Sequence, residues 1–401
     1  MNRRDFMKRC AWWTALLPAA SSVVFGGCGS QAYDLGLYQD FEVNFQGSVL
    51  VIGAGAAGLA ASYILDRYGI EHQVIEASSR FGGRVKRTTD MAEFPIDLGG
   101  EWIHTDPSVL ASLIDDPSVD GSIEVIPYSP QSVSIWKDGE VRSRNWVRNY
   151  YQEYKFKRTT WYGFLERYFA PAAMSRIHFD QPVTQIDTSG PGVVVTTSNG
   201  TIFEADRVLV TVPIAVLQND MITFNPPLTP EQTNALDRVH VPPGIKVFSR
   251  FEKSFYPDLL MNGGVLDDTS SDKLYYDAAF RKDSPDNVLG LFWVSEEARA
   301  LTEKDDDAVI ETVLAELDRM FDGQASRHHV QSMVQNWSAE PFIQGAYTVD
   351  FGGSHGAFTG AFAPDERRRM FFAGEAFGVD YSTVHGAMES AYESVRQMLF
   401  A

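Results

Sequence analysis

Three glycines in the first quarter of the chain are the residues best suited to holding a charged ligand. Gly53, Gly55 and Gly58 form the pattern G-x-G-x-x-G directly after a short apolar run at residues 48–52. Gly53 would permit a tight turn, Gly55 would let the backbone approach a pyrophosphate, and Gly58 would let a helix pack against the strand. The N-terminus of that helix, expected over residues 59–68, would offer N–H groups and a positive dipole end to phosphates. The pattern therefore predicts a dinucleotide site.

A carboxylate and a guanidinium follow the glycines. A second short strand, residues 72–75, ends at Glu76, which lies 23 residues after Gly53. At this separation a carboxylate meets the hydroxyl groups of an adenosine ribose. The run R-F-G-G-R at residues 80–84 comes next, where a fold that binds only nicotinamide would begin another helix. Two glycines beside Arg84 suit a second, charge-assisted contact to the pyrophosphate.

The end of the chain reads as a strand followed by a helix. Residues 370–373 are typical of a buried strand, and Gly374 would let the backbone pass close to a cofactor. An apolar stripe at helical spacing begins at Val384. A helix beginning there would direct its positive dipole end toward a negatively charged ligand. The same stripe is also typical of an ordinary terminal helix packed on the sheet, and the two interpretations are compatible.

These motifs together resemble those of one enzyme family. The glycine pattern with Glu76, the G-G-R at residues 82–84 and the run D-L-G-G-E-W-I-H at residues 97–104 are similar to those of flavin-dependent amine oxidases. That family includes monoamine, polyamine and L-amino acid oxidases. The resemblance extends over nearly the whole chain after residue 46. Its C-terminal part, Y-S-T-V-H-G-A at residues 381–387, looks most like the polyamine oxidases.

The resemblance implies an α/β fold in which a discontinuous, Rossmann-like FAD-binding domain is joined to an α+β substrate domain. The expected FAD-binding domain comprises residues 47–106, 172–241 and 343–401, and the expected substrate domain comprises residues 107–171 and 242–342. Fewer than 80 residues separate His104 from Val183, whereas relatives have a longer helical subdomain there. The aromatic and basic stretch at residues 145–169 is therefore expected to form a shortened helical lid.

The resemblance also implies which residues contact FAD. Glu375 would hold a ribityl or phosphate-side hydroxyl group, Val183 would contact adenine through its backbone, and the helix from Val384 would face the N1–O2 edge of the flavin. The expected cofactor-binding residues are Gly53, Gly55, Ala57, Gly58, Glu76, Arg84, Gly99, Gly100, Glu101, Val183, Trp337, Gly374, Glu375, Thr383 and Val384. Ala346 matches the cysteine that some monoamine oxidases bond to flavin, and no cysteine follows Cys28. FAD is therefore expected to be noncovalent, unless a histidine is used.

Three residues are expected to be catalytic: Lys246, Trp337 and Tyr347. Lys246 is similar to the family lysine that contacts flavin N5 through a water molecule, although from composition alone a strand lysine more often faces solvent. Trp337 and Tyr347 match aromatic residues that hold the amine against the flavin and exclude water. The expected substrate contacts are His104, Trp102, Tyr347 and Thr383. His104 reads equally well as a structural histidine, and Thr383 stands where monoamine oxidases carry a second tyrosine.

The implied reaction is oxidation of an amine, with a polyamine favoured, to an imine that water hydrolyses. Dioxygen then reoxidises the flavin and hydrogen peroxide is released. The net charge of −19 fits a polycationic substrate and argues against a nucleic-acid partner. Three alternatives stay open: a dehydrogenase with another electron acceptor, a flavin-binding surface protein without amine turnover, and an L-amino acid oxidase. The last would need a cation for the substrate carboxylate, and the candidates are Arg142, Arg144 and Arg148.

No metal site is expected. The chain has two cysteines, Cys10 and Cys28, and both precede the first recognisable element. The pair His328 and His329 reads as structural or solvated. The sequence makes no prediction about oligomeric state.

The first 27 residues are expected to be an export signal. Arg3 and Arg4 precede an uncharged stretch, residues 11–25, that is shorter than the about 20 residues a membrane-spanning helix needs. The pattern is similar to a twin-arginine signal, and Gly26, Gly27 and Cys28 resemble a lipoprotein cleavage box. An exported, periplasmic or cell-envelope-associated bacterial protein is expected, anchored to a membrane if Cys28 is lipidated, with a tether at residues 28–46. The alternative is a buried N-terminal helix.

Overall fold

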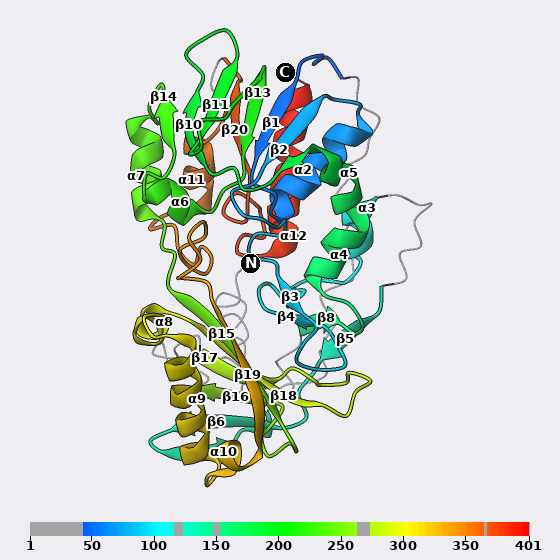
Figure 1. Ribbon diagram of the computed structural model, residues 1–401, viewed down its shortest axis with the longest axis vertical. Coiled ribbons are helices and arrows are strands. Elements are labelled where there is room, and N and C mark those ends of the chain that lie inside the picture. Colours follow the sequence, from blue (N-terminus) through cyan, green and yellow to red (C-terminus); the bar gives the residue numbers. More distant parts are fainter. Residues whose placement is uncertain (1–42, 116–122, 147–152, 263–272, 365–366, 401) are drawn as a thin grey trace, which may run out of the picture.

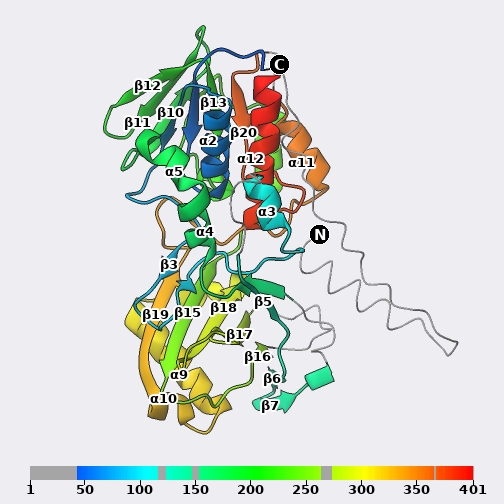
Figure 2. The ribbon, with the colours of Figure 1, turned by 90° about the vertical axis from the view of Figure 1, so that its right-hand side faces the viewer.

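The computed structural model describes residues 43–115, 123–146, 153–262, 273–364 and 367–400. The predicted export signal, Cys28 and most of the predicted tether lie outside the described residues. The molecule is elongated, with one half built on a parallel sheet and the other on a larger mixed sheet (Figures 1 and 2). Within the described ranges, no helix combines the length and apolar character needed to cross a bilayer.

A five-stranded parallel sheet forms the centre of the first half. Its strand order is β20 (Met370–Phe372), β13 (Arg207–Val210), β1 (Val49–Ile52), β2 (His72–Ile75) and β9 (Ile177–His178). All four residues of β1 are buried, as expected of a parallel strand covered on both faces. Val49 and Val51 belong to one apolar cluster, and Leu50 and Ile52 belong to another on the opposite face. The three predicted strands near residues 48–52, 72–75 and 370–373 are confirmed.

Two long helices cover one face of this sheet. Helix α2 (Ala56–Arg67) packs along helix α12 (Val384–Leu399), and they lie side by side in both views (Figures 1 and 2). Thr383 caps the N-terminus of α12: its hydroxyl accepts a hydrogen bond from the Gly386 N–H at 3.0 Å. Three shorter helices and a 3-10 turn complete this layer: α3 (Val109–Ile114), α4 (Trp161–Tyr168), α5 (Ala170–Ala173) and η2 (Met174–Arg176).

The opposite face is covered by a four-stranded sheet and three helices. The sheet order is β12 (Ile202–Ala205), β11 (Val193–Thr197), β10 (Val183–Asp187) and β14 (Thr223–Asn225). The helices are α6 (Ile214–Gln218), α7 (Pro230–Arg238) and α11 (His355–Ala361). Strands β10, β11 and β12 form an antiparallel meander that leads into β13.

A seven-stranded mixed sheet forms the second half. Its order is β19 (His329–Asn336), β15 (Gly244–Phe251), β18 (Asn287–Val294), β17 (Lys273–Asp277), β16 (Leu259–Asn262), β6 (Val133–Lys137) and β7 (Glu140–Ser143). One face packs against α9 (Asp306–Met320), with η3 (Glu296–Ala298), α8 (Arg299–Thr302) and α10 (Gln324–His328) nearby in the chain. The other face packs against residues of two short two-stranded sheets. These are β3 (Arg87–Thr88) with β4 (Ile96–Asp97), and β5 (Val125–Tyr128) with β8 (Glu153–Phe156).

The packing differs from the sequence prediction between residues 107 and 171. The domain boundaries stay a prediction, but helices α3 and α4 share the core of the parallel sheet with α2 and α12 rather than belonging to the second half. The expected helical lid at residues 145–169 is wrong for the residues described there. They form strand β8 and helix α4, and the side chains of Trp161 and Phe164 are buried in that core. Phe156 and Phe169 are buried in the same core, so these aromatic residues serve packing.

Candidate functional site

The glycine loop between β1 and α2 has the geometry of a phosphate cradle. Gly53 has a φ of 102°, which favours glycine. A Cβ added to Gly58 would lie 1.9 Å from the Gly53 carbonyl oxygen, so the helix can approach the loop only without a side chain there. A Cβ added to Gly55 would meet no protein atom within 4 Å. Gly55 therefore borders open space at the N-terminus of α2, next to the buried Ala57.

Glu76 lies beside this loop at the end of β2. One carboxylate oxygen accepts the Ala54 N–H at 2.7 Å, and the other accepts the Ser78 N–H at 2.9 Å. The carboxylate is thus held at the mouth of the glycine loop, where the sequence predicts a ribose contact.

Arg84 connects the second glycine-rich segment to the C-terminal strand and helix. Its Nη1 donates to the Ala346 carbonyl oxygen at 3.0 Å and to Glu375 Oε1 at 3.1 Å. Glu375 also accepts hydrogen bonds from Thr348, through the backbone N–H and the hydroxyl group. In this structure Arg84 and Glu375 therefore satisfy each other. Gly374, just before Glu375, has a φ of 146°.

Residues 97–101 pass between the two halves and contact Trp337 and Lys246, two of the three predicted catalytic residues. A Cβ on Gly99 would lie 1.8 Å from the Arg84 carbonyl oxygen and 3.0 Å from the Trp337 ring. The Trp337 indole N–H donates to the Leu98 carbonyl oxygen at 3.0 Å. A Cβ on Gly100 would lie 2.6 Å from Val384, the first residue of α12. The segment thus runs against both Trp337 and the N-terminal end of α12.

Lys246 projects from β15 onto the same segment. It is buried, which excludes the solvent-facing interpretation. The neighbouring Ile245 and Val247 pack in the cluster under α9, whereas Phe248 packs on the opposite face, as strand alternation requires. The Lys246 ammonium contacts Glu101 Oε2 at 2.9 Å.

Glu101 is the centre of a buried group of charges that the sequence analysis did not find. Burial alone would raise its pKa, but the Lys246 and Lys155 cations and hydrogen bonds from Tyr276 and Lys246 hold the pKa below its ordinary value. Burial and the neighbouring Glu101 raise the pKa of Asp97 well above its ordinary value. Lysines on short strands usually face solvent, so no sequence signal marked Lys155.

Two further titratable groups border this cluster. Burial raises the pKa of Asp277 to about 6, although the Lys155 cation opposes the shift. Burial and the Lys155 cation lower the pKa of Lys282 to about 8. Both groups belong to the seven-stranded sheet or the loop that follows β17.

The pKa of Asp277 predicts how stability depends on pH. Between about pH 4 and pH 6 the folded protein retains a proton that the unfolded chain has lost, so stability should fall as the pH rises through this window and then level off. Replacing Asp277 with asparagine should remove a decline of about 2–3 kcal/mol. Urea denaturation midpoints at several pH values measure it. The exposed Asp237→Asn is the control, and equal slopes for wild type and Asp277→Asn would refute the assignment.

A second polar group surrounds the N-terminal end of α12. His104 Nδ1 lies 3.0 Å from Glu153 Oε2. Three side chains also meet here: the nearest ring nitrogen or carboxylate oxygen atoms of Asp380, His385 and Glu389 lie within 4.8 Å of one another. The sequence analysis did not anticipate this group. A hydrogen bond from His385 lowers the pKa of Asp380, whereas burial lowers the pKa of His385.

The remaining predicted site residues lie in separate surroundings. The Trp102 ring contacts Tyr128 and Tyr276 edge-on, at centroid distances of 5.0 and 5.2 Å. Tyr347 is partly buried and lies between Ala346, which binds Arg84, and Thr348, which binds Glu375. Val183 is buried at the start of β10. The individual roles of all these residues stay predictions.

The residues named for alternative functions have ordinary partners. Arg142 pairs with Glu140 at 3.0 Å on the exposed strand β7, and Arg144 donates to the Ser143 carbonyl oxygen. Arg148 lies outside the described residues. His328 and His329 bind the side chains of Glu252 and Ser332, respectively, which agrees with their structural interpretation.

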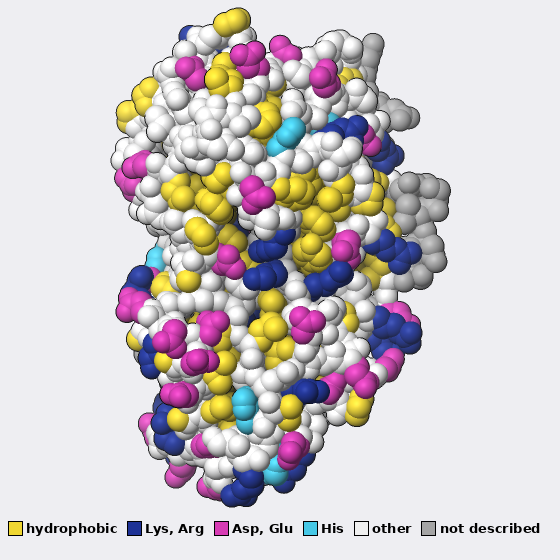
Figure 3. All heavy atoms as spheres, viewed as in Figure 1, with side chains coloured by type: hydrophobic (Ala, Val, Ile, Leu, Met, Phe, Trp, Pro, Cys, Tyr) yellow, Lys and Arg dark blue, Asp and Glu magenta, His cyan; other side chains and the backbone are white. Residues whose placement is uncertain are grey.

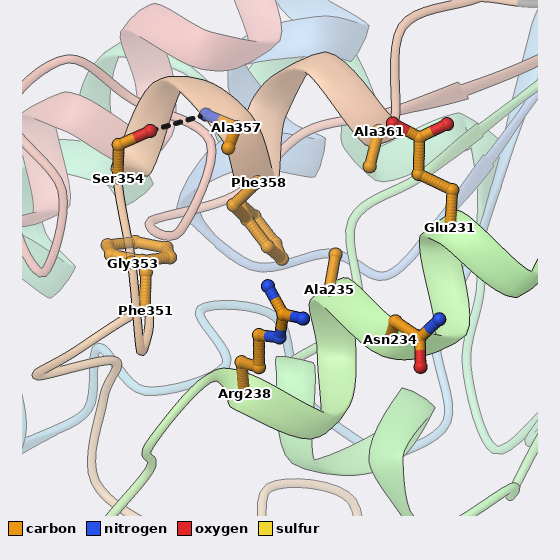
Figure 4. A pocket seen from close by; sticks show the side chains of 10 residues that line it. All are labelled: Glu231, Asn234, Ala235, Arg238, Phe351, Gly353, Ser354, Ala357, Phe358 and Ala361. Atoms are coloured by element: carbon orange, nitrogen blue, oxygen red, sulfur yellow. Dashed lines mark hydrogen bonds between the residues drawn. The ribbon is translucent and has the colours of Figure 1, made fainter.

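A pocket of about 440 Å³ between α7 and α11 lies apart from these residues (Figure 4). It is lined by Glu231, Asn234, Ala235, Arg238, Phe351, Gly353, Ser354, Ala357, Phe358 and Ala361. None of them belongs to the predicted site. On the face shown in Figure 3, Lys and Arg side chains gather near the middle, at the level where the two halves meet, despite the net charge of −19.

The chemistry of these donors fits FAD. Open space beside Gly55 and the uncapped N-terminus of α2 suit a pyrophosphate, and Glu76 suits the adenosine ribose. Trp337 and Lys246 lie along one segment, residues 97–101, that also touches the start of α12. A flavin ring would be held where these elements meet.

Comparisons with known proteins agree with this fit. Residues 159–399 match the family model described as flavin containing amine oxidoreductase, and residues 51–116 match an NAD(P)-binding Rossmann-like domain. The chain is 26% identical to human lysine-specific histone demethylase 2, over 85% of this chain and 52% of that protein. It thus spans about half the length of that relative. It is 24% identical to polyamine oxidase 4 of Oryza sativa subsp. japonica, over 86% of each chain.

Solved structures share the fold. Putrescine oxidase bound to putrescine aligns with a TM-score of 0.71 and 18% identity, over 89% of this chain and 100% of that one. Cyclohexylamine oxidase from Brevibacterium oxydans IH-35A aligns with a TM-score of 0.72 and 16% identity, over 88% of this chain and 99% of that one. At these identities the likeness establishes the architecture, which confirms the predicted α/β fold with a Rossmann-like cofactor domain.

Proposed function

The chain belongs to the family of flavin containing amine oxidoreductases, and from this premise we propose that it oxidises a primary or secondary amine, with a polyamine as the preferred substrate. FAD, the family cofactor, accepts the electrons removed from the amine when it is bound. We further propose that water hydrolyses the imine product, that dioxygen is the electron acceptor and that hydrogen peroxide is released.

The observation that carries this proposal is the convergence of Lys246 and Trp337 on residues 97–101, next to the first turn of α12. The Trp337 ring is 6% exposed and is fixed by its bond to Leu98, so it can present a rigid apolar surface to an amine and exclude water. Lys246 would supply a positive charge beside residues 97–101, where it could stabilise negative charge on a reduced flavin bound there.

Two features support a polycationic substrate. The Glu153 carboxylate lies beside His104, and the carboxylates of Asp380 and Glu389 lie beside His385 near the N-terminal end of α12. Such carboxylates suit an ammonium group. The chain as a whole is strongly acidic, which raises the local concentration of polycations. Polyamine oxidases also stand among the proteins similar to this chain.

Anaerobic reduction of the bound flavin tests the proposal. Spermidine or putrescine should bleach the flavin absorbance faster than an aromatic monoamine. An L-amino acid should bleach it more slowly than the corresponding amine without the carboxylate. Aerobic turnover should release peroxide in proportion to substrate. Faster bleaching by the amino acid would favour an L-amino acid oxidase, and turnover only with an artificial acceptor would favour a dehydrogenase. No bleaching by any compound would refute amine oxidation.

We also propose that the protein is exported through its twin-arginine-like signal and anchored through Cys28. The basis is the residue pattern in the first 28 residues. Replacing Arg3 and Arg4 with lysine should retain the protein in the cytoplasmic fraction, and replacing Cys28 with alanine should release it from membranes. Unchanged fractionation of both variants would contradict the proposal.

A further inference from the structure

The Lys246 ammonium is held on three sides. It has three N–H donors, and it contacts three acceptors: the Asp97 carbonyl oxygen at 3.2 Å, the Gly99 carbonyl oxygen at 2.9 Å and Glu101 Oε2 at 2.9 Å. Its side chain is only 4% exposed. Glu101 is the one charged acceptor of the three. The orientation of Lys246 therefore depends strongly on this carboxylate.

Glu101 serves a second buried cation as well. The Lys155 ammonium, on β8, lies 3.7 Å from Glu101 Oε1, and the Lys155 side chain is 2% exposed. Lys155 also donates to the Ala278 carbonyl oxygen at 3.0 Å. Its ammonium lies 5.0–5.9 Å from the ring centroids of Trp102, Tyr128 and Tyr276. These rings supply a weaker, cation–π attraction but no negative charge.

The carboxylate is itself fixed by the second half of the molecule. The Tyr276 hydroxyl, on β17, donates to Glu101 Oε2. Glu101 thus joins residues 97–101 to β8, β15 and β17. The other titratable groups around it are Asp97, Asp277 and Lys282.

Two buried cations that share one carboxylate differ from a simple ion pair, because the single negative charge must compensate two positive charges. Removing one partner of a buried pair is costly because the remaining charge loses its compensation. If Glu101 were neutral, Lys246 and Lys155 would repel each other in a site with little solvent. If residue 155 were also made neutral, this repulsion would disappear. The Lys246 ammonium would then remain hydrogen-bonded to two backbone carbonyl groups.

We propose that Glu101 is the shared counter-ion of Lys246 and Lys155, and that this arrangement positions the Lys246 ammonium for the reaction with dioxygen. Glu101 and Lys155 are thus positioning residues that act through Lys246. This inference rests on the proposed function for the role of Lys246, but the charge arrangement itself does not.

Three variants test it: Glu101→Gln, Lys155→Met and the double variant. Glu101→Gln should lower the Tm of the FAD-free protein by roughly 5–10 °C, and adding Lys155→Met should recover at least half of that loss. After chemical reduction with dithionite, reoxidation by dioxygen should slow about tenfold in Glu101→Gln and recover partly in the double variant.

The ion pair of the buried Lys273 with the partly buried Glu316 provides the control, because the two side chains lie 2.6 Å apart on the other face of the same sheet. Glu316→Gln should lower the Tm without changing the reoxidation rate. The proposal would be overturned if the Tm losses of Glu101→Gln and Lys155→Met were additive in the double variant. It would also be overturned if the double variant reoxidised no faster than Glu101→Gln.

Failure of the proposed function would look different. Chemical reduction needs no amine, so the reoxidation measurement remains informative if no amine reduces the flavin. The unfolding measurement needs no FAD at all.

Discussion

Replacing Lys246 with methionine is expected to slow reoxidation of the chemically reduced, FAD-loaded protein by about 100-fold. Lys246 supplies a fixed, buried positive charge against residues 97–101, the segment that also binds Trp337, and methionine keeps the length of the side chain without the charge. Because the charge is already in place, it needs no reorganisation when electrons move to dioxygen. Stopped-flow absorbance after anaerobic reduction measures the rate.

The matched control is Lys273→Met. Lys273 is also buried, ion-paired and located on the seven-stranded sheet, but it contacts Glu316 and the Trp293 ring instead of residues 97–101. The Lys273→Met variant should be less stable than the wild type but should reoxidise at the same rate. If Lys246→Met reoxidises as fast as Lys273→Met, Lys246 does not have the proposed role.

Alanine at Gly58 should weaken FAD binding by more than about 100-fold. The new Cβ would lie 1.9 Å from the Gly53 carbonyl oxygen, so α2 must move away from the loop that it shapes. Alanine at Gly55 should act differently, because no protein atom lies within 4 Å of its Cβ. We expect an unchanged Tm for FAD-free Gly55→Ala and at least tenfold weaker FAD binding, since the methyl group would occupy space expected for pyrophosphate.

Gly360→Ala is the control for both variants. Gly360 lies in α11, has no neighbour within 4 Å of an added Cβ, and is absent from the predicted site. Its FAD affinity should be unchanged, with a gain in stability of up to about 1 kcal/mol. Titration of deflavinated protein with FAD, followed by fluorescence, measures all three. Normal FAD affinity in Gly55→Ala would show that the cofactor does not approach this loop.

Local patterns were sufficient for the parts of the fold that are determined by neighbours in the chain. The strand, glycine loop, helix and second strand at residues 49–76 follow from an apolar run, the G-x-G-x-x-G spacing and Glu76. The start of α12 follows from the apolar stripe that begins at Val384, and the structure adds the Thr383 hydroxyl as its cap. The stretch at residues 145–169 was misread because an aromatic run reads the same whether it covers a pocket or fills a core.

By itself, therefore, the sequence determined the cofactor cradle and the resemblance to the family, since these depend on residue types at fixed spacings along the chain. Only the tertiary structure decided what Lys246 touches. Glu101, Lys155 and Tyr276 lie 145, 91 and 30 positions away from Lys246 in the chain. They meet because the two short sheets, β3 with β4 and β5 with β8, pack on the seven-stranded sheet. The balance of buried charge depends on distances of a few ångströms between these segments, and no pattern along the chain encodes such distances.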